Sequence, residues 1–187
     1  MKTSIAILAL VMVVGCGDDS SELLGIYTLD SWTENDSGCG SEGPSVLEGS
    51  GMSHFYVKEI SFFGQEFLNA SLCPELPGCR EDASDSELIS LGLFSYAFES
   101  GSDSKGWTGG GAIAGGGGGG ECSGEVFDYL MTDEGDGMVR IAVEVREVSG
   151  FPRDSDDFCD TDAAREAAEG QPCDRLEVLT GTFLEAI

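Results

Sequence analysis

The chain has 187 residues and is strongly acidic: nine residues are Lys or Arg, 35 are Asp or Glu, and the formal net charge at pH 7 is −26. Such a charge repels nucleic acid and anionic lipid surfaces, because binding to phosphates needs clustered Lys and Arg. The composition therefore argues against a nucleic-acid partner, and it indicates a surface that favours solvation or attracts cations.

The chain begins with a short apolar run that ends at a cysteine. Lys2 supplies a positive charge, and residues 5–14 are all apolar. The run is too short for the bilayer core, which takes about 20 residues of helix to cross. Its length is typical of the apolar region of a signal peptide, so we expect the chain to be exported from the cytoplasm.

The sequence VVGC, which ends at Cys16, resembles the lipobox of bacterial lipoproteins. In that family a peptidase cuts before the cysteine, which is then acylated. The resemblance implies a removed signal peptide at residues 1–15, a lipidated Cys16 and a polar tether at residues 16–22. Gly17 resembles the outer-membrane sorting pattern, which implies a lipid-anchored protein of the outer membrane that faces the periplasm or the cell surface. The alternative is an ordinary secretory signal with a chance cysteine.

Residues 23–187 are expected to form a single domain built from β-strands. Apolar and polar residues alternate most clearly at residues 138–148, where valines and an isoleucine take one face and charged side chains the other. The preceding sequence TDEGDG is typical of a hairpin turn after a first strand at residues 126–131. Similar runs, separated by turn residues, predict further strands at residues 24–32, 53–63, 66–72, 88–98 and 176–186.

Three segments between these runs differ from strands in composition. The sequence CPELPGCREDASD, at residues 73–85, is interpreted as a turn. Residues 109–120, GGGAIAGGGGGG, are expected to form a flexible loop inside the domain, because glycine is entropically costly to order. A short helix is expected near residues 161–169, with Thr161 or Asp162 as its N-cap.

Short strands at this spacing, with one short helix, predict an all-β fold: an antiparallel meander that forms a small barrel or a sandwich. The opening LLGIYTLDS, with Gly25 and Tyr27, and the closing strand with Arg175 resemble the small lipocalin-like barrels of bacterial lipoproteins. This resemblance implies an apolar ligand in the barrel lumen. The residues that would line the lumen are Phe55, Val57, Leu91, Phe94, Tyr96, Val139, Ile141 and Val143.

Six cysteines follow Cys16, and an even number in an exported chain indicates disulfides. Their spacing is not that of a zinc site. The sequence does not select one pairing, although each bridge would stabilise the fold by about 2–4 kcal/mol. Closeness along the chain favours Cys73–Cys79 and Cys159–Cys173, which leaves Cys39 for Cys122.

The sequence RDSDDFCDTD is a dense acidic stretch that offers oxygen ligands. Its carboxylates would either bind calcium weakly, as in some exported modules, or form a solvated loop that leads into the helix. The residues concerned are Asp154, Asp156, Asp157, Asp160 and Asp162.

No catalytic motif stands out. His54 is the only histidine, and the chain has neither a G-x-S-x-G nor an H-E-x-x-H sequence. We therefore expect no enzymatic activity, and no cofactor beyond weakly bound calcium.

The leading hypothesis is a lipoprotein with a filled core that serves in envelope structure or protein interaction. The alternatives are a lipocalin-like carrier of an apolar small molecule and, third, a hydrolase with converging carboxylates of raised pKa.

Overall fold

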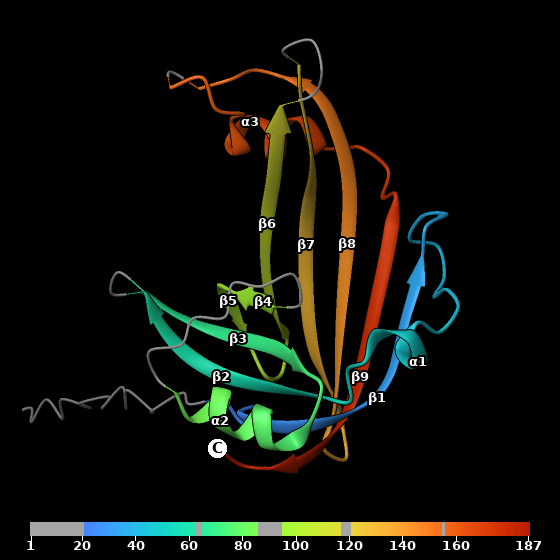
Figure 1. Ribbon diagram of the computed structural model, residues 1–187, viewed down its shortest axis with the longest axis vertical. Coiled ribbons are helices and arrows are strands. Elements are labelled where there is room, and N and C mark those ends of the chain that lie inside the picture. The colour runs from blue at the N-terminus through green and yellow to red at the C-terminus, as the bar shows by residue number, and fades with distance from the viewer. Residues whose placement is uncertain (1–20, 63–64, 86–94, 117–120, 155) are drawn as a thin grey trace, which may run out of the picture.

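The structure is a computed structural model, which describes residues 21–62, 65–85, 95–116, 121–154 and 156–187 (Figure 1). The expected signal peptide and Cys16 lie outside the described residues. The described chain forms one nine-stranded antiparallel sheet. Its strands are β1 (Gly25–Asn35), β2 (His54–Phe62), β3 (Gln65–Cys73), β4 (Ser95–Phe98), β5 (Ser100–Ser102), β6 (Gly106–Gly116), β7 (Cys122–Gly135), β8 (Met138–Phe151) and β9 (Arg175–Glu185).

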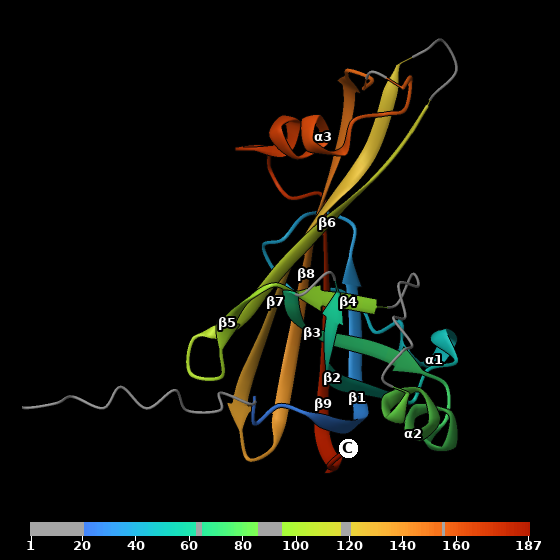
Figure 2. The ribbon, with the colours of Figure 1, turned by 90° about the vertical axis from the view of Figure 1, so that its left-hand side faces the viewer.

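The sheet curls into a nearly closed barrel (Figures 1 and 2). The strand order is β4-β3-β2-β1-β9-β8-β7-β6-β5, so the first and last strands, β1 and β9, lie side by side. The short chain from β4 to β5 connects the two edges: β4 pairs with β3, whereas β5 pairs with β6. Between them, the N–H of Glu99 donates to the carbonyl oxygen of Thr108 (2.8 Å). The expected all-β antiparallel fold is confirmed, and it is a barrel rather than a sandwich.

The barrel interior is filled by side chains that alternate along the strands. On β8, every second residue from Val139 to Val145 is at most 2% exposed, as the sequence pattern predicts. On the neighbouring strands β1 and β2, the paired residues Tyr27 and Phe55 stack their rings with the centroids 4.9 Å apart. Removal of this apolar surface from water is the main term that stabilises such a domain.

Strands β6, β7 and β8 continue beyond the barrel and form an arm that carries helix α3 (Thr161–Ala168) (Figures 1 and 2). β9 pairs with β8 only between Met138 and Val145, so the rest of β8 continues with β7 and β6 alone. Alanines of α3 pack against the face of the arm that is continuous with the outside of the barrel. The apolar cluster there contains Cys122, Val126, Val148, Phe151, Ala164 and Ala168.

Helix α3 confirms the helix expected near residues 161–169. Its N-cap is Asp160, one residue before the expected Thr161. The Asp160 carboxylate accepts hydrogen bonds from the backbone N–H groups of Asp162 (2.9 Å) and Ala163 (3.2 Å). These bonds satisfy donors that the first turn of a helix leaves without partners.

Further helices are α1 (Leu47–Ser50) and α2 (Leu76–Ser84). The expected turn at residues 73–85 is wrong, because α2 occupies most of this segment. Pro77 lies in the first turn of α2, where its missing N–H costs no helical hydrogen bond. Each helix in the described part of the chain is too short or too polar to span a bilayer.

The glycine-rich segment is a strand, and the expected flexible loop at residues 109–120 is wrong for its described part. β6 spans Gly106–Gly116 and pairs with β7 along its length. Gly109 is required, because an added Cβ would clash with the carbonyl oxygen of Ala97 in β4. Residues 117–120 lie outside the described residues.

Three disulfides join cysteines whose Cα atoms are 5.6 Å apart in each case. The pair Cys73–Cys79 forms as expected and links the end of β3 to α2. This bridge closes a short loop, because the two cysteines are only 6 residues apart. Closeness along the chain therefore predicts this bond correctly.

The other two expected disulfides are wrong. The structure pairs Cys39 with Cys173 and Cys122 with Cys159, instead of Cys159–Cys173 and Cys39–Cys122. The physical reason is strand pairing. The end of β1 pairs with the start of β9, which brings Cys39 beside Cys173. The start of β7 pairs with the end of β8, which brings Cys122 beside the segment that holds Cys159.

The described chain begins by docking on the turn between β5 and β6. Ser21 Oγ donates to Asp103 Oδ1 (2.7 Å), and the N–H of Glu22 donates to Asp103 Oδ2 (2.6 Å). The indole N–H of Trp107 donates to the same Oδ1 (2.7 Å). Burial alone would raise the pKa of the Asp103 carboxyl, but these hydrogen bonds outweigh burial and hold that pKa below its usual value. The start of the domain is thus fixed by one ionised carboxylate.

Candidate binding site

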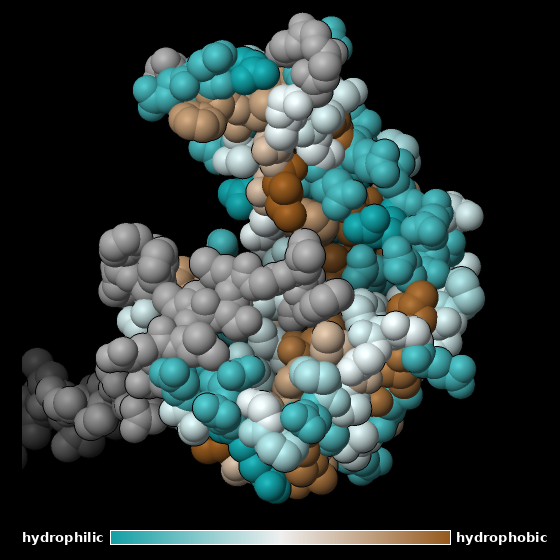
Figure 3. Space-filling model, in the orientation of Figure 1, coloured by the Kyte–Doolittle hydropathy of each residue, from teal (hydrophilic) through white to brown (hydrophobic). Residues whose placement is uncertain are grey.

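A cleft of about 610 Å³ opens between α3 and the barrel. Figure 3 shows a hollow on the side of the molecule where α3 overhangs the barrel. Its lining includes residues 109–111 of β6 and 126–128 of β7. Arg165 contributes from α3, and Glu99 contributes from the rim of the barrel. The cleft therefore lies where the arm leaves the barrel.

The cleft borders an unpaired strand edge. β6 pairs with β7 on one side, but on its other side it pairs with β5 only at residues 106–108. Within the described residues, positions 109–116 have no strand partner on that second side. An edge of this kind presents backbone N–H and C=O groups to a further chain. Proteins usually protect such edges with charged residues or Pro, and residues 109–116 contain neither.

The side chains along this edge leave its backbone accessible. Residues 109–116 are glycine and alanine except for Ile113, whose side chain is 60% exposed. Around Gly115, no heavy atom lies within 4 Å of an added Cβ. A partner strand would therefore meet an open backbone around Gly115 and one apolar side chain, whereas the backbone of Ala97 lies against Gly109 at the start of this edge.

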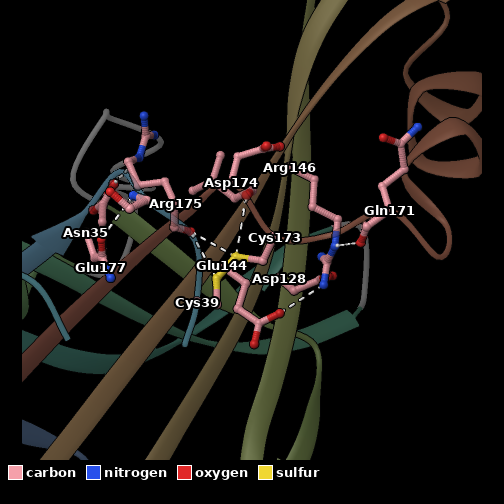
Figure 4. Close-up of a disulfide and its surroundings, with 12 residues drawn as sticks. Asn35, Cys39, Asp128, Glu144, Arg146, Gln171, Cys173, Asp174, Arg175 and Glu177 are labelled. Carbon is pink, nitrogen blue, oxygen red and sulfur yellow. Dashed lines mark hydrogen bonds and ion pairs between the residues drawn. A yellow bond between two sulfur atoms is a disulfide. The ribbon is translucent and has the colours of Figure 1, made fainter. Parts of the chain in front are cut away.

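Two arginines line the cleft and differ in their partners. Arg146 is held in place: it forms an ion pair with Asp128 and another with Glu144 (2.9 Å), and it donates to the carbonyl oxygen of Gln171 (3.3 Å) (Figure 4). Arg165 makes no ion pair with any described residue, whereas every other arginine of the chain does. In a chain of net charge −26, Arg165 gives the cleft a cationic group that no carboxylate of the described residues pairs.

A second group of charges lies where β1 ends and β9 begins. Arg175 pairs with Glu34 (3.7 Å), Glu125 (3.5 Å) and Glu177 (3.2 Å). Burial raises the pKa of the Glu177 carboxyl, and Arg175 opposes this increase. Trp32, Glu34 and Glu177 also line a second cleft of about 620 Å³. Because Arg175 pairs with all three carboxylates, we interpret the group as an ion network that fixes this end of the barrel.

The residues expected to line a lumen form part of the filled core. Of the eight, those within the described chain are at most 6% exposed and belong to one apolar cluster. Leu91 and Phe94 lie outside the described residues. The cluster members from this set are Phe55, Val57, Tyr96, Val139, Ile141 and Val143.

The acidic stretch between β8 and α3 shapes the chain locally. Asp154 accepts hydrogen bonds from two backbone N–H groups that follow it in the loop. Asp160 is the N-cap of α3, and Asp157 pairs with Arg153 (3.7 Å). These carboxylates stabilise the turn and the helix that follows it.

The described residues hold one group of three potential metal ligands with their atoms close together: Cys39, Glu144 and Cys173. Both of its cysteines are joined in a disulfide, so they offer no thiolate. His54 lies at the start of β2, where its Nδ1 is 2.7 Å from Ser53 Oγ. Neither place provides a metal site with the ligands shown.

The strand edge and Arg165 are the features that sequence reasoning missed. Residues 109–116 are interpreted as loop from their glycine content, so no edge was expected there. The available signal was the apolar run Ala112, Ile113 and Ala114 between the glycines. Arg165 belongs to the expected helix, but the sequence does not show that it lacks a carboxylate partner.

Known proteins give no further guide to this site. Comparisons with protein-family models, with curated proteins and with solved structures found no match to this chain.

Proposed function

We propose that this chain is an outer-membrane lipoprotein whose non-catalytic β-domain binds a partner protein. The partner adds an extended strand to the free edge of β6, next to the cleft below α3. The observation that carries this proposal is the edge at residues 109–116, which pairs with no described strand and carries no charged residue or Pro. Strand addition obtains affinity from backbone hydrogen bonds, and specificity from side chains that enter neighbouring pockets.

The charges around the edge suggest the chemistry of the partner strand. Arg165 is available for a carboxylate of the partner, and an ion pair that includes Arg is favoured by its planar, multiply donating group. Ile113 offers one apolar contact on the same strand. The partner segment would therefore be extended, with an acidic residue that reaches α3 and an apolar residue beside Ile113.

The filled interior supports an interaction module over a small-molecule carrier. A carrier needs a concave apolar cavity that encloses most of its ligand. Phe55, Val57 and Tyr96 are only 1%, 0% and 6% exposed, and all three belong to the same apolar core cluster. The two clefts and the β6 edge all lie on the surface of the described domain.

Cross-linking in cells tests the strand edge directly. With a photoreactive amino acid at position 113, we expect a discrete cross-linked band. A Gly115→Lys substitution should abolish this band, because a lysine on an open edge discourages strand pairing. Gly115 tolerates the side chain sterically, since nothing lies within 4 Å of its added Cβ.

The matched control is Gly40→Lys, because Gly40 also has nothing within 4 Å of an added Cβ and lies outside β6. This variant should keep the band. Circular dichroism should show that both variants are folded. A band that survives Gly115→Lys, or that Gly40→Lys removes equally, would contradict binding at the edge.

A Cys16→Ser substitution tests the lipid anchor. Each methylene of an acyl chain that enters the bilayer contributes about 0.8 kcal/mol, so loss of the acylated cysteine should release the protein from the membrane fraction. A Ser20→Ala variant, altered in the same tether, should stay with the outer membrane in a density gradient. Continued pelleting of the Cys16→Ser protein after salt and carbonate washing would contradict the proposed anchor.

A further inference from the structure

Four exposed apolar residues, named here the apolar rim, lie at one end of the barrel where β8 begins and β9 ends. It consists of Met138 (41% exposed), Phe183 (41%), Leu184 (44%) and Ile187 (51%). Met138 and Phe183 are close in space, because the N–H of Phe183 donates to the carbonyl oxygen of Gly137 (2.7 Å), next to Met138. Leu184 and Ile187 follow Phe183 along the chain. Figure 3 shows apolar surface at this lower end of the molecule, opposite α3. Several exposed apolar side chains together mark an interaction surface more often than a scattered single one does.

The N-terminal end of the described chain lies at the same end of the barrel. Tyr27 donates to the carbonyl oxygen of Leu23 (2.8 Å), and its ring contacts the ring of Phe183 with centroids 5.7 Å apart. Ser21 is fixed two residues before Leu23 by its hydrogen bond to Asp103. Figures 1 and 2 both place the start of β1, the turn between β7 and β8 and the C-terminus together, far from α3.

The tether is too short to hold the rim far from a membrane. Ser21 follows Cys16 by five positions, and a fully extended chain of that length reaches at most about 18 Å. An acylated Cys16 would lie at the lipid surface. The barrel end that carries Ser21 must then stay within that distance of the lipid headgroups.

We propose that the apolar rim rests on the lipid surface, so that α3 and the edge of β6 point away from the membrane. This inference rests on the proposed lipid anchor. Exposed Asp133, Glu134 and Asp136 flank the rim in the turn between β7 and β8. Their charge repels anionic headgroups, so the surface that fits the rim is zwitterionic.

The test uses the full acylated protein in phosphatidylcholine vesicles. An environment-sensitive fluorescent amino acid replaces Leu184 in one variant and Ile113 in a matched variant, because Ile113 is exposed on the arm. We expect a blue shift of emission at position 184, with quenching by acyl-chain-labelled lipid. The probe at position 113 should show a spectrum like that in water. In vesicles with phosphatidylglycerol, the shift at position 184 should be smaller at low salt and recover at high salt.

Failure of the rim contact can be distinguished from failure of the lipid anchor, because mass spectrometry of the N-terminus first establishes whether Cys16 is acylated. An unacylated Cys16 would overturn the anchor, and the rim contact with it. If Cys16 is acylated but the probe at position 184 shows a spectrum like that in water, the rim contact alone is overturned and the anchor stays in place. A blue shift at position 113 instead of position 184 would show the reverse orientation and would also overturn the inference.

Discussion

Replacement of both Cys39 and Cys173 by Ser is expected to lower the free energy of unfolding by about 5 kcal/mol, in the loop-closure account of disulfide stabilisation. This bridge joins residues 134 positions apart, so its loss frees the largest loop in the unfolded chain. It also ties the segment after β1 to the segment that leads into β9, next to Arg175 and Glu177 (Figure 4). Urea unfolding of the oxidised protein measures the loss.

The matched control is the double variant Cys73→Ser with Cys79→Ser. Its cysteines are 6 positions apart, so the same account gives a loss of only about 2 kcal/mol. Equal losses for the two variants, or a larger loss for the short loop, would contradict the argument from loop length. Non-reducing peptide mapping should recover a Cys39–Cys173 peptide, and a peptide that joins Cys159 to Cys173 would contradict the pairing itself.

A Gly109→Ala substitution is expected to destabilise the protein by about 2–3 kcal/mol. The added methyl group would clash with the carbonyl oxygen of Ala97 and would lie 2.9 Å from the Cα of Phe98. Both atoms belong to backbone, which cannot rotate away as a side chain can. They also belong to β4, which closes the barrel against β6, so the clash should weaken that closure. Thermal and urea unfolding measure the change.

A Gly115→Ala substitution on the same strand is the control. Its methyl group would meet no heavy atom within 4 Å, so the variant should be unchanged or more stable by about 0.5 kcal/mol, because alanine loses less chain entropy on folding. Similar destabilisation by both substitutions would show that the strand needs glycine for another reason. A neutral Gly109→Ala would show that β4 and β6 do not approach as closely as the structure places them.

Local patterns in the sequence determined the elements whose geometry depends on near neighbours. Alternation of valines with charged residues predicts β8, and the TDEGDG turn predicts its hairpin with β7, because strand faces repeat every second residue. The capped alanine run predicts α3 for a similarly local reason. Together these patterns are enough to predict an all-β antiparallel domain with one short helix near residues 161–169, although they miss α2.

The candidate site was predicted much less well, since its parts meet only after folding. The sequence places Arg165 in a helix, but the absence of a carboxylate partner depends on which elements lie beside that helix. Aspartates of the acidic stretch look like metal ligands in sequence, whereas Asp154 and Asp160 accept backbone hydrogen bonds in the fold. The same residue type serves either purpose, and only its surroundings decide.

By itself, the sequence determined the acidic charge, the set of cysteines and the positions of most strands along the chain. Only the tertiary structure decided the partners of Cys159 and Cys173, because the pairing of β1 with β9 and of β7 with β8 brings each of them beside a cysteine that is distant along the chain. It also decided that residues 109–116 form a strand with one free edge. Glycine disfavours ordered strand, but β7 supplies a complete ladder and the backbone of Ala97 leaves no room for a side chain at Gly109. Contacts between distant segments outweighed the local preference there, and no local pattern in the sequence predicts them.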